Sequence, residues 1–378
     1  MPNAHKPLIA VLDGSIAVTG ALKAVAVGAN LLAGETRTLL ILPEGSLVSP
    51  SDVPACVDLV FAPLPMLRRS VASLLTYLPA TLRSALHLKR LLKERQVKTL
   101  QVNDFYLLPG FLVRPLGWKG RIVAMLRIDT RRFGLAGRLW LNVARRWSDR
   151  LCAVSRFIAD TVGGAPSPMV LLNPVENVSR RTDIDGPRPP RLVFISNYIR
   201  GKGQDTAIRA FQRAAADFPD AELHFHGGDM GLAKNVTYRR ELEALAASGA
   251  GAQQIRFHDF TTDTAAILDG ARAALVLSHS ESFSLTCQEA SAHGVPVIAT
   301  RCGGPAEIVE DGVTGFLIAV EDDEAAADRM RRLLRDPELA EAMGQRGAAL
   351  MQERFSPERW VREVRPLLGL PDPVSPAL

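Results

Sequence analysis

Short apolar runs alternate with longer segments of helical periodicity along most of the chain. In the first half, helical segments such as Gly20–Leu32 and Thr81–Arg95 separate the apolar runs. This alternation is typical of a parallel β-sheet covered by helices on both faces. The strands predicted in this half are Leu8–Leu12, Thr38–Leu42, Leu59–Ala62, Thr99–Val102, Ile122–Leu126, Leu151–Val154 and Met169–Leu172.

The alternation pauses at a polar, proline-rich stretch, Ser179–Pro190, and then resumes. Composition of this kind is typical of a linker. We therefore predict an α/β fold of two Rossmann-like domains, residues 1–180 and 191–355, joined by a linker at 181–190. Ligands bind such sheets at the carboxyl ends of the strands, so a shared site is expected in a cleft between the domains. The strands predicted in the second half are Arg191–Ile195, Glu222–Phe225, Gln254–Phe257, Ala273–Ser278 and Val295–Thr300.

The composition is that of a soluble globular protein, since 47% of the 378 residues are hydrophobic and 22% are charged. Charge interrupts every apolar stretch before it reaches the roughly 18 residues of a membrane-spanning helix. The four cysteines are scattered and lack the spacing of a zinc site. This pattern favours a reduced, cytoplasmic protein without structural zinc.

Charge is unevenly divided between the two halves. Residues 1–180 carry 23 Lys and Arg against 11 Asp and Glu, a net charge of +12, whereas the remainder carries 22 against 29, a net charge of −7. The basic half is expected to face an anionic partner, either a phosphorylated substrate or a membrane surface. Nucleic acid is not expected, because the chain has no recognition motif and its aromatic residues are not interleaved with the basic clusters.

Two glycine-containing loops follow strands of the second domain. After Arg191–Ile195, Lys202 lies between two glycines just before a predicted helix at Thr206–Ala215. A lysine at a helix start adds a point charge to free backbone N–H groups and suits a phosphate; the alternative is an ordinary solvent-exposed turn. Gly227 follows the next strand, where the lack of a side chain would let a ligand approach the backbone.

Two acidic residues mark the loop and helix after the strand Ala273–Ser278. Glu281 lies in the loop and Glu289 on the predicted helix Leu285–His293, with seven residues between them. Carboxylates accept hydrogen bonds from vicinal hydroxyls, so the pair could hold two sugar rings. Taken singly, Glu281 could instead be a capping acid and Glu289 a solvated helix residue. Their joint position between two strands favours a binding role.

The segment from Ser278 to Thr300, SHSESFSLTCQEASAHGVPVIAT, resembles the donor-site signature of family 4 glycosyltransferases, as does Gly303–Phe316, GGPAEIVEDGVTGF. The resemblance covers roughly residues 190–365 and is diffuse in the first half. It implies a GT-B fold and transfer from a nucleotide-diphosphate sugar with retention of configuration. It also implies no required metal or other cofactor, and a C-terminal segment, residues 356–378, whose helix Pro357–Leu368 returns toward the first domain.

The resemblance also implies roles for individual residues. Glu281 would act catalytically beside the reacting carbon of the donor sugar, and Arg127 would be the catalytic group of the first domain. Glu289 would hold the nucleotide ribose, and Lys202 would neutralise the diphosphate. The full set of predicted donor-binding residues is Gly20, Asn197, Lys202, Gly227, Phe283, Ser284, Leu285 and Glu289.

The chain departs from the family pattern at three places. Asn197 stands where arginine is usual, which removes one charge from the phosphate clamp. Ser282 and Ser284 stand where glycines usually flank the phenylalanine. Arg127 follows the strand after which the family often has histidine, and arginine is a poor proton shuttle because it does not deprotonate. Arg127 could still approach the donor, or could be a plain surface arginine.

A basic amphipathic helix is predicted near residues 131–147. Phe133, Trp140 and Trp147 recur every seven residues, and an arginine series with the same period lies on another face. The stripe could face the core, with the arginines solvated. Alternatively, this surface could rest on anionic lipid headgroups or on a lipid-diphosphate acceptor. Further basic residues that support the second interpretation are Arg68, Arg69, Lys89, Arg90, Lys93 and Arg95.

The resemblance, together with the basic first half, implies a retaining hexosyltransferase whose partners are a nucleotide-sugar donor, a saccharide or lipid-linked acceptor and, as a candidate, an anionic membrane surface. Its expected role is the assembly of bacterial cell-surface polysaccharide or lipopolysaccharide, by a cytoplasmic or peripheral membrane protein. The alternatives are a GT-B sugar-nucleotide epimerase or hydrolase, and a non-catalytic scaffold that binds the sugar nucleotide.

Overall fold

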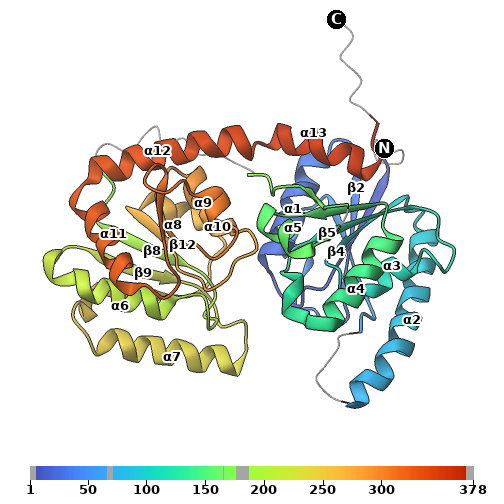
Figure 1. Cartoon of the computed structure of the whole chain (residues 1–378), viewed down its shortest axis with the longest axis horizontal. Coiled ribbons are helices and arrows are strands. Elements are labelled where there is room, and N and C mark those ends of the chain that lie inside the picture. Colours follow the sequence, from blue (N-terminus) through green and yellow to red (C-terminus); the bar gives the residue numbers. More distant parts are fainter. Residues whose placement is uncertain (1–5, 66–70, 165, 176–186, 372–378) are drawn as a thin grey trace, which may run out of the picture. The chain divides into compact units, whose positions relative to one another are not determined.

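The computed structural model describes residues 6–65, 71–164, 166–175 and 187–371 (Figure 1). Contacts divide the chain into two compact units. Unit 1 comprises Met1–Pro174 with Pro357–Leu378, and unit 2 comprises Val175–Ser356. Residues 181–186 of the predicted linker, and also Arg68 and Arg69, lie outside the described residues. Residues 187–190 of that linker are described, and Arg188 is buried and donates to the carbonyl of His293 at 2.8 Å.

The described part of unit 1 contains a seven-stranded parallel sheet in the order β3-β2-β1-β4-β5-β6-β7. Each strand overlaps one of the predicted apolar runs, so the alternation correctly predicted the sheet. The strands are β1 (Leu8–Asp13), β2 (Arg37–Pro43), β3 (Val57–Ala62), β4 (Thr99–Asn103), β5 (Arg121–Leu126), β6 (Arg150–Ala153) and β7 (Met169–Val170).

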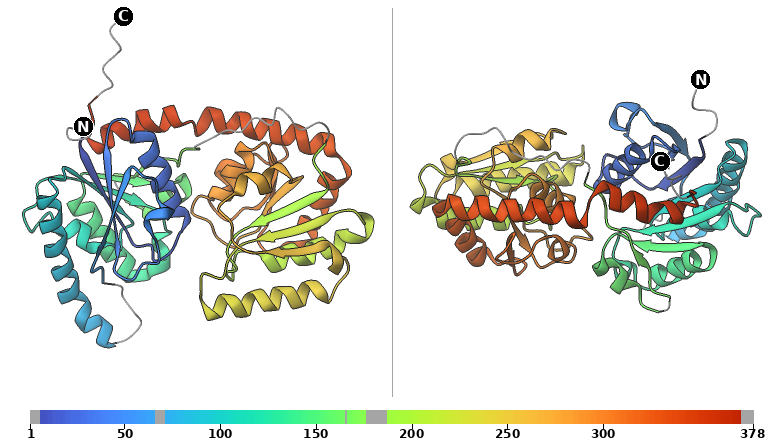
Figure 2. Two further views of the ribbon diagram at one scale, coloured as in Figure 1. Left: turned by 180° about the vertical axis from the view of Figure 1, so that it is seen from behind. Right: turned by 90° about the horizontal axis from the view of Figure 1, so that it is seen from above.

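Helices cover the sheet of unit 1. Helix α1 packs its apolar face on β1, β2 and β3 through residues such as Leu22 and Val25, and α13 lies beside α1 (Figure 2). Helices α2, α3 and α4 lie next to one another (Figure 1). The helices are α1 (Gly20–Leu32), α2 (Val71–Glu94), α3 (Leu108–Leu112), α4 (Gly134–Trp147), α5 (Arg156–Val162) and α13 (Pro357–Leu368), with short 3₁₀ turns η1 (Pro50–Asp52) and η2 (Thr130–Phe133).

Unit 2 contains a parallel sheet in the order β10-β9-β8-β11-β12-β13. Five of its strands were predicted and β13 was not, because only three apolar residues follow Gly315 there. Such a short run does not stand out from a loop. The strands are β8 (Arg191–Ile195), β9 (Glu222–His226), β10 (Ile255–His258), β11 (Ala273–Val276), β12 (Val297–Thr300) and β13 (Gly315–Ile318).

The main core of unit 2 forms between one face of this sheet and helices α6, α7 and α11, with Phe194, Phe211 and Phe225 at its centre. Because crossovers between parallel strands are right-handed, α9 and α10 cover the opposite face. The helices are α6 (Gln204–Ala214), α7 (Ala233–Ala247), α8 (Thr264–Asp269), α9 (Leu285–Ala292), α10 (Pro305–Ile308), α11 (Asp323–Arg335) and α12 (Pro337–Arg354), with η3 (Ala215–Asp217) and η4 (Ala252–Gln254).

Both sheets reverse their strand order once, between β1 and β4 in unit 1 and between β8 and β11 in unit 2. At such a switch point the neighbouring loops diverge toward opposite faces, which leaves a crevice at the carboxyl ends of the two strands. The loops of unit 2 that carry most of the predicted site residues follow β8 and β11.

Helix α12 packs closely on α9, which makes one glycine of α12 essential. A Cβ atom on Gly344 would lie 1.9 Å from the carbonyl oxygen of Gly294, whereas one on Gly347 would meet Ser291 at an ordinary 3.6 Å. We expect Gly344→Ala to lower the free energy of unfolding of unit 2 by about 2 kcal/mol, because the helices must separate. Gly347→Ala should be neutral or stabilising by up to ~1 kcal/mol, because alanine favours the helix. Chemical denaturation of both variants checks this, and equal effects would contradict the packing.

Candidate functional site

An ion pair joins the two loops at the switch point of unit 2. Lys202 follows β8 and Glu281 follows β11, and Lys202 Nζ lies 2.7 Å from Glu281 Oε1. The Ser278 hydroxyl donates to the same oxygen at 2.7 Å. The two charged side chains are 31% and 18% exposed. The pair is therefore accessible to a ligand while its carboxylate is fixed from two sides.

Glycine packing explains why Lys202 lies where it does. Gly203 has a φ of +84°, and a Cβ atom there would lie 2.0 Å from the carbonyl oxygen of Leu277. Only glycine allows both the left-handed conformation and this close approach. The amide of His279 also donates to the carbonyl of Gly201 at 2.8 Å. The Gly-Lys-Gly segment is thus packed against the end of β11, and it is not a free solvent-exposed turn.

The start of α9 presents backbone N–H groups beside this ion pair. Ser284 has a φ of +90° and caps the helix through its hydroxyl, which accepts from the amide of Cys287 at 3.3 Å. Within the described part of the chain, the amides of Phe283, Ser284 and Leu285 donate no hydrogen bond. Free N–H groups at a helix N-terminus form an anion-binding site. The loop is held by the buried Phe283, against whose backbone Gly304 packs.

Glu289 lies on α9, one turn after Leu285, and is half-buried. Among the described residues its carboxylate has no ion pair or hydrogen-bond partner. It therefore keeps its full capacity to accept hydrogen bonds from a ligand. Glu281 and Glu289 lie on consecutive segments, the loop after β11 and helix α9.

Asn197 and Gly227 connect the loops after β8 and β9. The side-chain oxygen of Asn197 accepts from the amide of Gly228 at 3.1 Å. A Cβ atom on Gly227 would lie 2.0 Å from the carbonyl oxygen of Ser196. The absence of a side chain at Gly227 therefore allows the two loops to pack closely. Asn197 joins these loops through a hydrogen bond, and its uncharged side chain adds no positive charge to the site.

The other two predicted residues, Gly20 and Arg127, lie in unit 1. Gly20 is the first residue of α1, is exposed, and follows the capping residue Thr19. Arg127 follows β5 and is half-buried. Its guanidinium donates to Asn173 Oδ1 at 3.2 Å, and its amide donates to Asp104 Oδ1 at 2.8 Å. Arg127 is therefore anchored within unit 1 and is not a plain surface arginine.

Arg127 belongs to a buried polar cluster that the sequence did not reveal. Asp13 at the end of β1 accepts from Asn103 at the end of β4 at 2.7 Å, across the switch point of this sheet. Burial raises the pKa of Asp104 to about 7, although the amide and charge of Arg127 oppose the shift. Burial likewise lowers the pKa of Arg127, although the negative charges of Asp13 and Asp104 oppose this shift. These residues lie at the ends of three strands, β1, β4 and β5, so only the fold brings them together.

Arg127 also lines a cavity in unit 1. The cavity volume is about 40 Å³, and its polar lining residues include Gln101, Arg127 and Asn173. The Nε atom of Arg127 is buried and has no hydrogen-bond partner among the described residues. A water molecule needs only about 10–15 Å³ of this volume. The cavity is therefore large enough for ordered water, and too small for a sugar.

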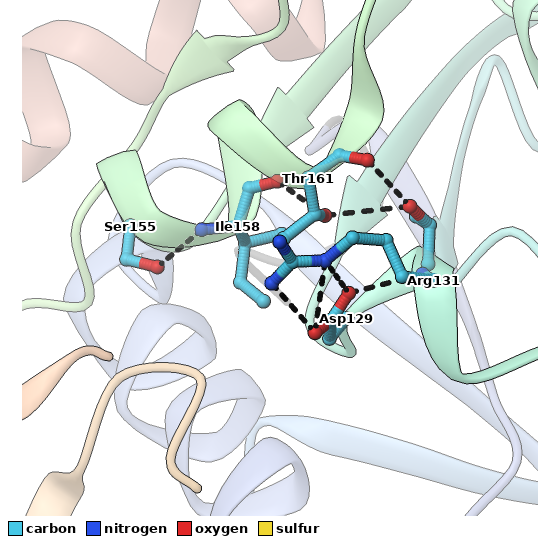
Figure 3. Close-up of polar contacts among 6 residues, drawn as sticks. Asp129, Arg131, Ser155, Ile158 and Thr161 are labelled. Atoms are coloured by element: carbon cyan, nitrogen blue, oxygen red, sulfur yellow. Dashed lines mark hydrogen bonds and ion pairs between the residues drawn. The ribbon is translucent and has the colours of Figure 1, made fainter. Parts of the chain in front are cut away.

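The predicted basic helix corresponds to α4, and Phe133 and Trp140 of its aromatic stripe pack together beside the buried Phe105. The ring of Phe133 lies 5.5 Å from Phe105 and 5.7 Å from Trp140. The core-facing interpretation of the stripe is therefore correct for these residues. The charge of Arg131 is paired, as Figure 3 shows, because its Nε donates to Asp129 at 3.0 Å.

The part of the chain that carries the ion pair and the α9 amides is similar to known proteins. Residues 180–349 match the family "Glycosyl transferases group 1". N-acetyl-alpha-D-glucosaminyl L-malate synthase of Bacillus anthracis is 32% identical over 178 residues, which cover 46% of this chain and 43% of that protein. A GDP-mannose-dependent alpha-(1-6)-phosphatidylinositol monomannoside mannosyltransferase of Mycolicibacterium smegmatis is 34% identical over 170 residues, 42% of each chain. The chain thus matches less than half the length of these relatives.

Solved structures resemble the chain over nearly its whole length. Anabaena HepE, in complex with UDP and glucose, gives a TM-score of 0.76 at 19% identity, covering 96% of this chain and 99% of that one. The lipopolysaccharide outer core galactosyltransferase WaaB, in its apo form, gives 0.68 at 14% identity with the same coverage. These likenesses confirm the predicted fold class, an α/β protein with two Rossmann-like units of the GT-B type.

Ser284 provides a test of the strained loop. Its left-handed backbone costs roughly 1–2 kcal/mol for a residue with a side chain, whereas exchanging a serine cap for glycine costs only a few tenths. We therefore expect Ser284→Gly to raise the free energy of unfolding by about 1 kcal/mol. Ser284→Ala keeps the strain and loses the cap, and should lower it by about 1 kcal/mol. Urea unfolding of both variants measures the difference, and a glycine variant less stable than the alanine variant would refute the assigned strain.

Proposed function

We propose that this protein is a retaining glycosyltransferase that transfers a hexose-type sugar from a nucleotide-diphosphate sugar to a saccharide or lipid-linked acceptor. The observation that carries the proposal is the accessible Lys202–Glu281 ion pair beside the unpaired amides at the start of α9. This arrangement offers positive charge, N–H donors and a carboxylate within two adjoining loops. A sugar diphosphate needs these same three groups.

The proposed chemistry depends on stabilising the leaving group. Departure of a nucleoside diphosphate builds negative charge on its phosphate oxygens. Lys202 and the amides of Ser284 and Leu285 would meet that charge with donors that are already oriented. Each such donor can contribute roughly 3 kcal/mol to transition-state stabilisation. Glu281 would face the donor sugar once Lys202 turns toward the diphosphate.

Glu289 would bind the nucleotide ribose. Its carboxylate is half-buried and has no partner among the described residues, so two vicinal hydroxyls can donate to it without displacing a protein contact. The relatives support a nucleotide-sugar donor, because one is named as GDP-mannose-dependent and Anabaena HepE was solved with UDP and glucose. We keep both uridine and guanosine nucleotides as candidate donors.

The proposed pathway is assembly of bacterial cell-surface polysaccharide or lipopolysaccharide, as the similarity to WaaB suggests. The competing activity is hydrolysis or epimerisation of the donor, and the second alternative is binding without turnover. The names of the relatives favour transfer over both. Acceptor-dependent release of nucleoside diphosphate would indicate transfer, acceptor-independent release would indicate hydrolysis or epimerisation, and binding without release would indicate a scaffold.

Substitutions at the ion pair and at Glu289 should separate catalysis from binding. Glu281→Ala should abolish transfer, and Lys202→Ala should reduce kcat by roughly 10²–10³-fold, because one donor to the leaving group is lost. Glu289→Ala should weaken nucleoside diphosphate binding by roughly 10- to 100-fold, because a hydrogen bond to a charged group is lost. Nucleoside diphosphate release with membrane extract as the acceptor source, and calorimetric titration, measure these effects.

The matched control is Glu353→Ala, because Glu353 is an exposed glutamate on α12 of the same unit. It should leave both kcat and nucleotide affinity unchanged. Thermal unfolding should show that all four variants fold. An unchanged transfer rate in the Glu281 variant would overturn the assignment of the site, whatever its effect on stability.

We also propose that unit 1 rests on an anionic membrane surface. Leu78, Leu82 and Leu86 recur every four residues on α2 and are 71%, 49% and 49% exposed. Exposed Arg83 and Arg90 lie on the same helix. An apolar stripe flanked by basic residues is typical of helices that lie in the membrane interface. None of the described helices is long and apolar enough to cross a membrane.

This surface can be tested with lipid vesicles. Leu82→Glu should reduce sedimentation with vesicles that contain phosphatidylglycerol, because it places an anionic group in the apolar stripe. The control is Leu47→Glu, since Leu47 is an exposed leucine of unit 1 outside the helices, and this change should leave sedimentation unchanged. Binding of the wild-type protein should fall with salt and on neutral phosphatidylcholine vesicles. Equal binding of both variants would contradict the proposal.

A further inference from the structure

Three histidines converge on one face of the unit 2 sheet, next to the loops of the donor site. His224 and His226 are two residues apart on β9, so their side chains share a face, opposite Leu223 and Phe225 in the core. His258 ends β10 and pairs in register with His226. One ring nitrogen from each histidine lies within 4.8 Å of the others. The pairing of β9 with β10, and not a sequence motif, assembles this cluster.

The spacing of two of these nitrogens matches that of neighbouring zinc ligands. His224 Nδ1 lies 3.1 Å from His258 Nε2. Ligands about 2.0–2.1 Å from a tetrahedral zinc ion are roughly 3.3 Å apart. The ring of His226 stacks on that of His258, with centroids 4.4 Å apart. A ring nitrogen of His226 lies within 4.8 Å of those of the other two histidines, so this ring would have to turn to reach the third ligand position.

A carboxylate fixes the tautomer of His224. Glu222 Oε2 lies 3.1 Å from His224 Nε2, so this nitrogen carries the proton and Nδ1 keeps a free lone pair. Arg191 donates to the same carboxylate oxygen at 3.1 Å and holds it in place. Carboxylates that orient a metal-binding histidine in this way are the usual outer partners of zinc sites.

We propose that His224, His226 and His258 form a binding site for a divalent transition-metal ion, Zn²⁺ being the best fit, with Glu222 as the residue that orients His224. Imidazole ligands suit zinc, and a three-histidine site leaves a fourth position for water. The proton on His258 Nε2 would shift to Nδ1 when the ion binds. This site is separate from the donor site, and no step of the proposed transfer passes through it.

The position of the site gives it a structural consequence. Gly227 and Gly228 directly follow His226, and Gly228 is the residue tied to Asn197. The carbonyl of His258 accepts from the hydroxyl of Tyr198 at 3.2 Å. A bound ion would therefore tie β9 to β10 directly beside the loop after β8. We expect binding of the ion to stabilise this end of unit 2.

The test uses the full chain without a polyhistidine tag, stripped with a chelator and then dialysed against Zn²⁺. One zinc ion per chain should remain bound by elemental analysis, and the thermal midpoint should rise, since the ion binds the native state. Co²⁺ in place of Zn²⁺ should give the intense visible absorption of a four-coordinate site.

Substitutions of the proposed ligands and of Glu222 test where the ion binds. His224→Ala and His258→Gln should each abolish stoichiometric binding, and Glu222→Gln should weaken it by about 10–100-fold. The control is His87→Ala, because His87 is an exposed histidine on α2 of unit 1, and this change should leave the stoichiometry at one. Circular dichroism should show that each variant is folded. Failure of the wild-type chain to retain zinc, or zinc retained equally by His224→Ala and His258→Gln, would overturn the proposal.

Discussion

The ion pair between Lys202 and Glu281 is the interaction on which the donor site depends. It joins the two loops that diverge at the switch point of unit 2, and its oxygen also accepts from Ser278. Lys202 holds its position because Gly203 packs against the end of β11. The Glu281 side chain is only 18% exposed, and its carboxylate would lose part of its solvation without a partner. In the absence of a ligand the lysine therefore serves as the counterion of Glu281, and an incoming diphosphate would compete for the same ammonium group.

The two units use their switch points differently. In unit 2, charged side chains there remain accessible and backbone N–H groups are left unpaired, as a binding site requires. In unit 1, Asp13 and Asn103 bind each other across the switch point, and Arg127 is anchored to Asn173. That cluster is largely satisfied within the unit, with the exception of the Arg127 Nε atom that faces no described partner. The switch point of unit 1 thus holds a polar cluster that is largely hydrogen-bonded within the unit, whereas the exposed Leu78, Leu82 and Leu86 lie elsewhere, on α2.

Much of the fold could be predicted from sequence because strands in parallel sheets are short apolar runs. Strand β13 was missed, since its run is too short to distinguish from a loop. In the donor site the segment around Glu281 was recognisable because its residues are contiguous. Gly304 and the polar cluster around Asp104 were not predicted, because each acts through neighbours that are distant in the sequence. The hydrogen bond of Ser278 to Glu281, three residues away, was not predicted because it depends on the conformation of the loop. The three histidines were missed for the same reason. The pairing of β9 with β10 brings them together, and the spacing of residues along the chain does not reveal such a cluster.

The most direct test of the central claim is a crystal structure of the protein with a bound nucleoside diphosphate. The account predicts diphosphate oxygens within hydrogen-bonding distance of Lys202 Nζ and of the Ser284 and Leu285 amides, with Lys202 turned away from Glu281. A nucleotide bound elsewhere, while the 2.7 Å contact between Lys202 and Glu281 persists, would contradict it.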